Sequence, residues 1–203
     1  MAAPGPTTPS RWHRLAASRT TLWIALAWGF AEATLFFVVP DVWLGFIALF
    51  APFRVPRAFV AVLVGAMAGS LVLWWLAPVL PLLGEVIAGL PAIGPAAMET
   101  ARRAVTTEGL PAMVNLPFQG PPLKVYVHAA ALAGSSGFEL LLFVVLNRIA
   151  RIVPLVLVAV VFGVGLRGWI ARHATMTLVT YALVVSLGYL AYWASGGASA
   201  LRQ

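Results

Sequence analysis

The chain has 203 residues, of which 62% are hydrophobic and only 9% are charged. This composition excludes an ordinary water-soluble domain and is typical of proteins with several membrane-spanning helices. There is no cysteine, which excludes disulfides and thiol chemistry, and the net charge of +7 is scattered between apolar segments, which disfavours a nucleic-acid-binding surface.

The N-terminal part of the chain predicts a basic tail followed by a broken hairpin. Residues 1–20 are rich in Pro, Ser and Thr, carry three arginines, and predict a disordered cytoplasmic tail. The next apolar segment is interrupted by Pro40, and Asp41 is placed to cap a second helix that is too short to cross a bilayer. Residues 21–53 therefore predict a re-entrant helical hairpin. A cleavable signal peptide ending at residues 31–33 is the alternative, but the apolar segment continues beyond that point.

The middle of the chain predicts one span and a second broken hairpin. Residues 58–80 predict a membrane-spanning helix, with Gly65 and Gly69 spaced so that another helix can approach closely. At 95–106 the apolar and charged residues fall on opposite faces, which predicts an interfacial helix on the membrane surface. Residues 107–134 combine Pro and Gly breaks with one short apolar helix, and they predict a second re-entrant hairpin.

Two further spans, at 138–163 and 174–194, complete the prediction of an all-α polytopic membrane protein with about three transmembrane helices and two hairpins. The hairpin-then-span order occurs twice with opposite orientation, an inverted repeat typical of transporters. Seven arginines and no acidic residue lie in three segments, which the positive-inside rule places in the cytoplasm together with the N-terminus: 1–20, 54–57 and 167–172.

The span at 138–163 carries polar residues in its middle, namely Asn147, Arg148 and Arg151. An arginine at the bilayer centre costs about 2.5–3.5 kcal/mol on insertion scales. The spacing gathers these residues on one side of the helix, which predicts that this side faces protein or a polar cavity. In the alternative interpretation, Arg148 extends to the membrane surface as an anchor.

Three more charges lie within the hairpins: Glu32 and Asp41 in the first and Lys124 in the second. Charge in such segments is costly unless it is paired or hydrated. We therefore predict that two acids from one half meet a lysine and two arginines from the other half. The residues predicted to form a substrate-binding or translocation site are Glu32, Asp41, Lys124, Asn147, Arg148 and Arg151.

Two other motifs are weaker. Residues 163–168 match GxGxxG, but no strand precedes them, so they predict a helix end. Residues 134–137 match the GxSG of intramembrane serine proteases, yet His128 lies only six residues upstream on a short helix, where it is poorly placed as a base. No metal-binding motif is present, and we predict neither catalytic residues nor a metal.

Several short motifs within residues 21–163 carry a family resemblance: Gly29-Phe30-Ala31-Glu32-Ala33, Pro40-Asp41, Gly65 with Gly69, Gly120-Pro121-Pro122-Leu123-Lys124-Val125, and Asn147-Arg148-Ile149-Ala150-Arg151. In these the chain resembles the DedA family of VTT-domain membrane proteins, and particularly its short bacterial members. It departs from the family pattern in having Ser70 where an acid often follows the glycines, a single proline at the first break, and arginines only three residues apart.

The resemblance implies a protein of the bacterial inner membrane that moves anionic lipids, such as polyprenyl phosphates or phospholipids, between leaflets. It implies coupling to the proton-motive force in some members, and essential roles for the hairpin acids and later arginines, here Glu32, Asp41, Arg148 and Arg151. Cations suit a lipid phosphate, and no cofactor is expected. The alternatives are a non-transporting scaffold whose buried charges fix its packing, and a membrane-embedded lipid enzyme, for which a nucleophile and base are lacking.

Overall fold

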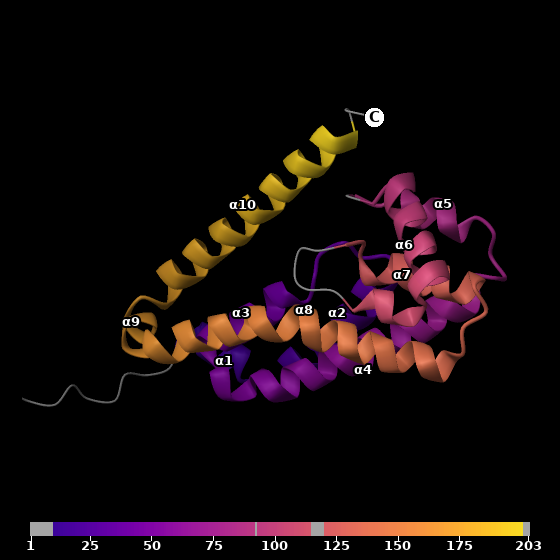
Figure 1. The fold of residues 1–203 in the computed structure, drawn as a ribbon. Helices are drawn as coiled ribbons and strands as arrows, with labels where there is room; N and C mark the ends of the chain where they lie inside the picture. Colours follow the sequence, from indigo (N-terminus) through magenta and orange to yellow (C-terminus); the bar gives the residue numbers. More distant parts are fainter. Residues whose placement is uncertain (1–9, 92, 115–119, 201–203) are drawn as a thin grey trace, which may run out of the picture.

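The computed structural model describes residues 10–91, 93–114 and 120–200, and every regular element in these ranges is a helix (Figure 1). In chain order the helices are α1 (Arg11–Ala16), α2 (Thr20–Thr34), α3 (Asp41–Phe50), η1 (Pro52–Arg54), α4 (Val55–Leu76), α5 (Leu83–Ala88), α6 (Pro95–Glu108), η2 (Leu110–Met113), α7 (Leu123–Leu132), α8 (Gly137–Gly165), α9 (Arg167–Arg172) and α10 (Ala174–Ala200).

Three of these helical segments are long and apolar enough to cross a membrane: Pro52–Leu76, Gly137–Gly165 and Ala174–Ala191. They correspond to the three spans predicted from the sequence, and their length and composition indicate a membrane protein. The helices α3 and α7 are apolar but have only ten residues each, which is too short for a crossing.

The tightest packing in the fold joins α2 to α4 through glycines on both helices. A Cβ added at Gly29 would overlap the carbonyl of Val62, and one at Gly69 would lie 2.6 Å from the carbonyl oxygen of Phe30 and 3.0 Å from the Cβ of Ala33. These contacts advance in the same direction along both helices, so α2 and α4 run parallel. Gly65 and Gly69 therefore have the packing role that their spacing predicted.

The helix α8 runs back along the bundle. Its first residue, Gly137, faces Trp74 near the end of α4, and Gly163 near its own end lies directly against the carbonyl of Ala48 in α3. In Figure 1, α8 lies along α4, while α5, α6 and α7 gather at one end of the bundle and α1 and α9 at the other. By contrast, α10 rises from α9 at an angle to α8.

Buried apolar side chains form two clusters, one toward each end of the bundle. The first apolar cluster lies around α1, α3 and the end of α8, and it includes Ala16, Leu44, Ile47, Phe50, Val62, Ile152 and Ile170. The second apolar cluster lies around α5, α6, α7 and the start of α8, and it includes Leu73, Ile87, Val105, Met113, Leu123, Leu140 and Val144. On α8, Val144 and Ile152 belong to different clusters, and Arg148 lies one turn from each.

The structure corrects two predicted features of the first hairpin. The first helix ends at Thr34, well before the interruption that was predicted at Pro40, and the Thr34 hydroxyl donates to the carbonyl of Ala31 at 2.9 Å. Asp41 is not a helix cap, because the cap position belongs to Pro40 and no side chain makes a capping bond there. Residues 35–40 thus form a longer connection than expected, which we call the α2–α3 connection.

The predicted tail regions also differ. Residues 11–16, predicted to be disordered, form α1, and the hydroxyl of Thr21 ties the helix to α2 by donating to the carbonyl of Leu15 at 2.5 Å. The turn at 167–172 is the short helix α9. The last helix continues through Ala200, six residues beyond the predicted end of the span at residue 194. Residues 1–9 of the predicted tail and residues 115–119 of the second predicted hairpin lie outside the described residues.

Candidate functional site: a buried charged cluster

Glu32 and Arg148 form an ion pair in the interior of the bundle. Glu32 lies on α2 and Arg148 on α8, and the Arg148 Nη2 donates a hydrogen bond to the Glu32 Oε2. Each side chain is only 5% exposed. Arg148 therefore points inward and does not extend to the membrane surface, so the anchor interpretation is wrong for this residue. The pairing of an acid from the first half with an arginine from the second is the one that the sequence predicted.

Asp41 adds a second carboxylate to the same region. It is the first residue of α3, and its charge is close enough to Arg148, Glu32 and Arg151 to interact with all three. Its Oδ1 is fully buried and has no hydrogen-bond partner among the described residues. A buried carboxylate oxygen without a donor is unfavourable, and such atoms in native structures often mark a bound water, ion or ligand.

Lys124 joins the two halves through the backbone of the α2–α3 connection. It lies in the first turn of α7, is 2% exposed, and its Nζ donates to the carbonyl oxygen of Phe36 at 2.6 Å. Phe36 follows the end of α2, and its carbonyl lies outside the helical hydrogen-bond pattern of that helix. The ammonium group is also close enough to interact with Glu32 and Arg148. Lys124 thus supplies both charge and a backbone anchor.

Asn147 and Arg151 complete the set on α8. Asn147 is fully buried, and its Nδ2 donates to the carbonyl of Met113 at the end of η2. Arg151 is half-buried, and its Nη1 lies 3.5 Å from the carbonyl oxygen of Pro121, at the outer limit for a hydrogen bond. Two turns of helix beyond Asn147, Pro154 provides no N–H for the carbonyl of Ala150, which weakens α8 beside Arg151.

The five charged residues among the six predicted ones are therefore close enough to interact where the two halves of the chain adjoin, with Asn147 next to Arg148 on α8, and we call all six the charged cluster. Three cations against two carboxylates leave one excess positive charge in this cluster. Several buried polar atoms around it have no partner among the described residues: the Asp41 Oδ1, the Asn147 Oδ1 and the Arg148 Nε. The region thus combines excess positive charge with unused hydrogen-bonding groups, and both properties suit a polar or anionic ligand.

The weaker motifs have structural roles here. The Ser136 hydroxyl caps α8 by accepting from the N–H of Glu139 at 3.1 Å, and the Ser135 hydroxyl donates to the carbonyl of Ala130 at 2.8 Å. His128 is buried beside Gly84, where an added Cβ would lie 3.2 Å from the imidazole. The GxGxxG at 163–168 begins in the last turn of α8, as predicted for a helix end. The described residues contain no group of three or more metal-ligating side chains.

Sequence reasoning missed the part played by α10. The hydroxyl of Tyr189 accepts a hydrogen bond from the N–H of Val39 at 2.8 Å, and the hydroxyl of Tyr181 donates to the carbonyl of Val42 at 2.6 Å. The last helix is therefore bonded to both sides of the break that precedes Asp41. Two tyrosines eight residues apart in an otherwise apolar helix lie within about 80° of each other around the helix axis, and this weak pattern was the sequence signal.

No known protein-family model, no characterised protein and no solved structure shows a significant match to this chain.

Proposed function

We propose that this chain moves an anionic lipid between the two leaflets of a bacterial inner membrane, as expected from its resemblance to DedA proteins. The observation that carries the proposal is the charged cluster, which lies between two apolar clusters in a chain with three membrane-length helices. Charge at such depth is costly, and polar residues there typically mark a substrate or ion pathway.

The arrangement of the helices is compatible with two re-entrant hairpins. The helix α2 begins, and α3 ends, beside the first apolar cluster, so the pair enters the bundle and returns to the same end. The short α7 approaches from the second apolar cluster and brings Lys124 to the α2–α3 connection. We propose that these hairpins form an inverted repeat around the membrane midplane, with the N-terminus in the cytoplasm as the arginine distribution predicts.

In this proposal the cations hold the lipid phosphate and the acids stabilise the empty site. Arg148 offers a planar set of donors suited to phosphate oxygens, and its Nε is unused among the described residues. Release of Arg148 toward a phosphate would leave Glu32 without its partner. Protonation of Glu32 or Asp41 would then remove the uncompensated charge, which is how lipid movement would couple to a proton gradient.

A non-transporting scaffold is the second candidate, and one observation favours it. The Lys124 ammonium and the Arg148 guanidinium already have protein partners, the Phe36 carbonyl and the Glu32 carboxylate. In a scaffold these bonds would serve packing alone. Conservative replacement would then lower the amount of folded protein and leave no separate activity to lose.

The test is leaflet exchange of labelled lipids in liposomes that contain purified protein. We expect wild type to accelerate exchange of phosphatidylglycerol or a polyprenyl phosphate, but not of diacylglycerol, which lacks phosphate. Arg148→Lys keeps the charge and loses the planar donor set, and it is expected to slow exchange about tenfold, equivalent to about 1.4 kcal/mol. Arg57→Lys, at an exposed position on α4, is the matched control and should exchange lipid like wild type.

The two candidates give different results. Loss of exchange by Arg148→Lys with a normal unfolding temperature supports transport. A wild type that accelerates no lipid, with or without a proton gradient, would reject transport and leave the scaffold.

A further inference from the structure

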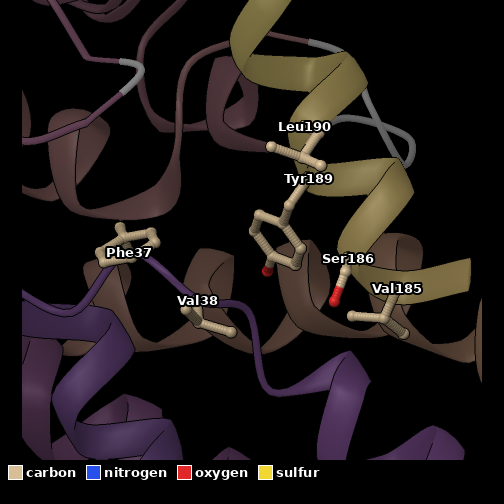
Figure 2. A pocket seen from close by; sticks show the side chains of 6 residues that line it. All are labelled: Phe37, Val38, Val185, Ser186, Tyr189 and Leu190. Carbon is tan, nitrogen blue, oxygen red and sulfur yellow. The ribbon is translucent and has the colours of Figure 1, made fainter. Parts of the chain in front are cut away.

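A cavity of about 360 Å³ lies between the α2–α3 connection and α10 (Figure 2). This volume is within the range of small-molecule sites in proteins. Four of its six lining residues are apolar, and the lining consists of Phe37, Val38, Val185, Ser186, Tyr189 and Leu190. Figure 2 shows Tyr189 and Ser186 extending from α10 toward the connection that carries Phe37 and Val38.

Hydrogen bonds from α10 hold the wall of this cavity in place. Tyr189 bonds to the N–H of Val39, the residue directly after the lining residue Val38. Tyr181, two turns earlier, bonds to the carbonyl of Val42 and lies so close to Gly45 that any added Cβ would collide with its hydroxyl. The two elements that line the cavity are therefore joined to each other by hydrogen bonds.

The surroundings of the cavity are suited to hydrocarbon. The other faces of α10 carry large apolar side chains that are more than half exposed, and the helix is long and apolar enough to cross a membrane: Val179, Leu183, Val184 and Leu187. In a bilayer these side chains contact lipid chains directly. A lipid chain can thus reach the cavity from the same hydrocarbon layer, without passing through water.

The cavity and the charged cluster share the α2–α3 connection. Phe37 directly follows Phe36, whose carbonyl oxygen accepts the hydrogen bond from Lys124. Asp41 lies three residues after Val38, at the end of the same connection. The cluster carries one excess positive charge, with three cations against two carboxylates, and so is complementary to one phosphate. A membrane lipid with a phosphate headgroup has both matching parts: an anionic group for the charged cluster and an apolar chain for the cavity.

We propose that this cavity binds one hydrocarbon chain of an anionic membrane lipid whose phosphate interacts with the charged cluster. The inference rests on the proposed function for the position of the phosphate. It adds a chain-binding site formed by α10, a helix outside the predicted repeat. The occupant is a lipid from the bilayer, and neither a soluble phosphate nor a second copy of the chain satisfies both parts of the site.

The first experiment fills the cavity. Val185→Trp and Ser186→Trp each place an indole at the lining, while Leu187→Trp makes the same change on the same helix at a position that is 63% exposed and outside the lining. In the lipid-exchange assay we expect both lining variants to slow exchange of phosphatidic acid about tenfold. Leu187→Trp should match wild type. Size-exclusion and thermal-unfolding profiles identify any variant that fails to fold, and the two lining positions provide independent tests.

The second experiment detects the lipid chain directly and does not depend on transport. Phosphatidic acid with a photoreactive diazirine in one chain is added to protein in detergent, and the labelled peptides are identified by mass spectrometry. We expect labelling at residues 37–38 and 185–190. Unlabelled phosphatidic acid should compete, diacylglycerol should compete poorly, and Val185→Trp should abolish the labelling.

The outcomes separate this inference from the proposed function. If wild type exchanges lipid and all three tryptophan variants match it, the chain site is wrong although transport stands. If wild type exchanges no lipid but the cavity is labelled with phosphate-dependent competition, the site stands without transport. Labelling spread evenly over α10, or a disulfide-linked dimer through Val185→Cys in this cysteine-free chain, would overturn the inference.

Discussion

Breaking the Glu32–Arg148 ion pair is the most direct perturbation of this fold. The structure predicts that replacing Arg148 destabilises the protein more than replacing Glu32. Arg148→Met removes the ion-pair partner of Glu32 and one of the two arginines that interact with Asp41. After Glu32→Gln, Asp41 is still close enough to Arg148 to interact with it. The Oδ1 of Asp41 also lacks a hydrogen-bond donor among the described residues. Asp41 therefore compensates for the loss of Glu32. After the loss of Arg148 the cations that remain are Lys124, whose ammonium already donates to the Phe36 carbonyl, and the half-buried Arg151, so the compensation is weaker.

The size of the effect follows from burial. Both side chains of the pair are 5% exposed, so neither is hydrated enough to tolerate the loss of its partner. Removing one member of a buried pair typically costs about 3–5 kcal/mol. For a chain of this length that corresponds to a decrease of about 6–20 °C in the unfolding temperature. We expect Arg148→Met at the upper end of this range, Glu32→Gln at the lower end or below it, and the double variant to be milder than Arg148→Met.

The assay is thermal unfolding of purified protein in detergent, followed by the intrinsic fluorescence of the eight tryptophans. Arg57→Met, at an exposed position on α4, serves as the matched control for loss of an arginine. The double variant yields the interaction energy from the departure from additivity. If the losses of stability in the two single variants simply added in the double variant, the direct Glu32–Arg148 pairing would be refuted. If the two single variants lost equal stability, the compensation by Asp41 would be refuted.

Three further predictions concern topology, packing and surface charge. Cysteines introduced as Ser10→Cys and Ser199→Cys should be labelled by an impermeant reagent from opposite sides of the membrane, because an odd number of spans separates them, and labelling from one side would exclude three spans. Gly163→Ala should destabilise the protein by about 1–3 kcal/mol because its Cβ would overlap the Ala48 carbonyl, whereas Gly188→Ala, with nothing within 4 Å, should not; equal effects would contradict the close packing of α8 on α3. Hydrogen bonds from Arg102 and Arg103 lower the pKa of Glu99 to about 2. Their contribution to the stability of the folded protein is therefore complete above the ordinary glutamate pKa and is lost as the pH falls through about 2. A midpoint near the ordinary value in an NMR titration of the Glu99 carboxyl group would disprove this prediction.

The sequence predicted the positions of the spans and the meeting of charges because both follow from strong local energies. A long apolar segment in a membrane forms a helix because the helix satisfies all of its backbone hydrogen bonds. Arg148 at the centre of such a segment requires an acidic partner, and the chain has only six acidic residues. The glycines at 65 and 69 likewise indicated close helix packing through the absence of a side chain.

Other features depended on contacts between distant residues and could not be predicted. The early end of α2 at Thr34 frees the carbonyl of Phe36 for Lys124, which lies 88 residues later in the chain. Asp41 followed the usual pattern for a helix cap, but it contributes its charge to the interior instead. The bonds from Tyr181 and Tyr189 depend on where α10 rises from α9, and an apolar helix with an almost uniform surface gives no indication of that direction.

The long sequence separation within the charged cluster has a consequence for biosynthesis. Glu32 is synthesised 116 residues before Arg148, which at about 5–20 residues per second is an interval of about 6–23 s. For most of that interval the first hairpin contains two carboxylates without the cations that later neutralise them, of which Lys124 is the first to be synthesised. We expect the hairpin to remain at the membrane surface, or to be held by the insertion machinery, until α8 emerges. A chain truncated before residue 148 should therefore be degraded rapidly, even though it contains a complete membrane-spanning α4.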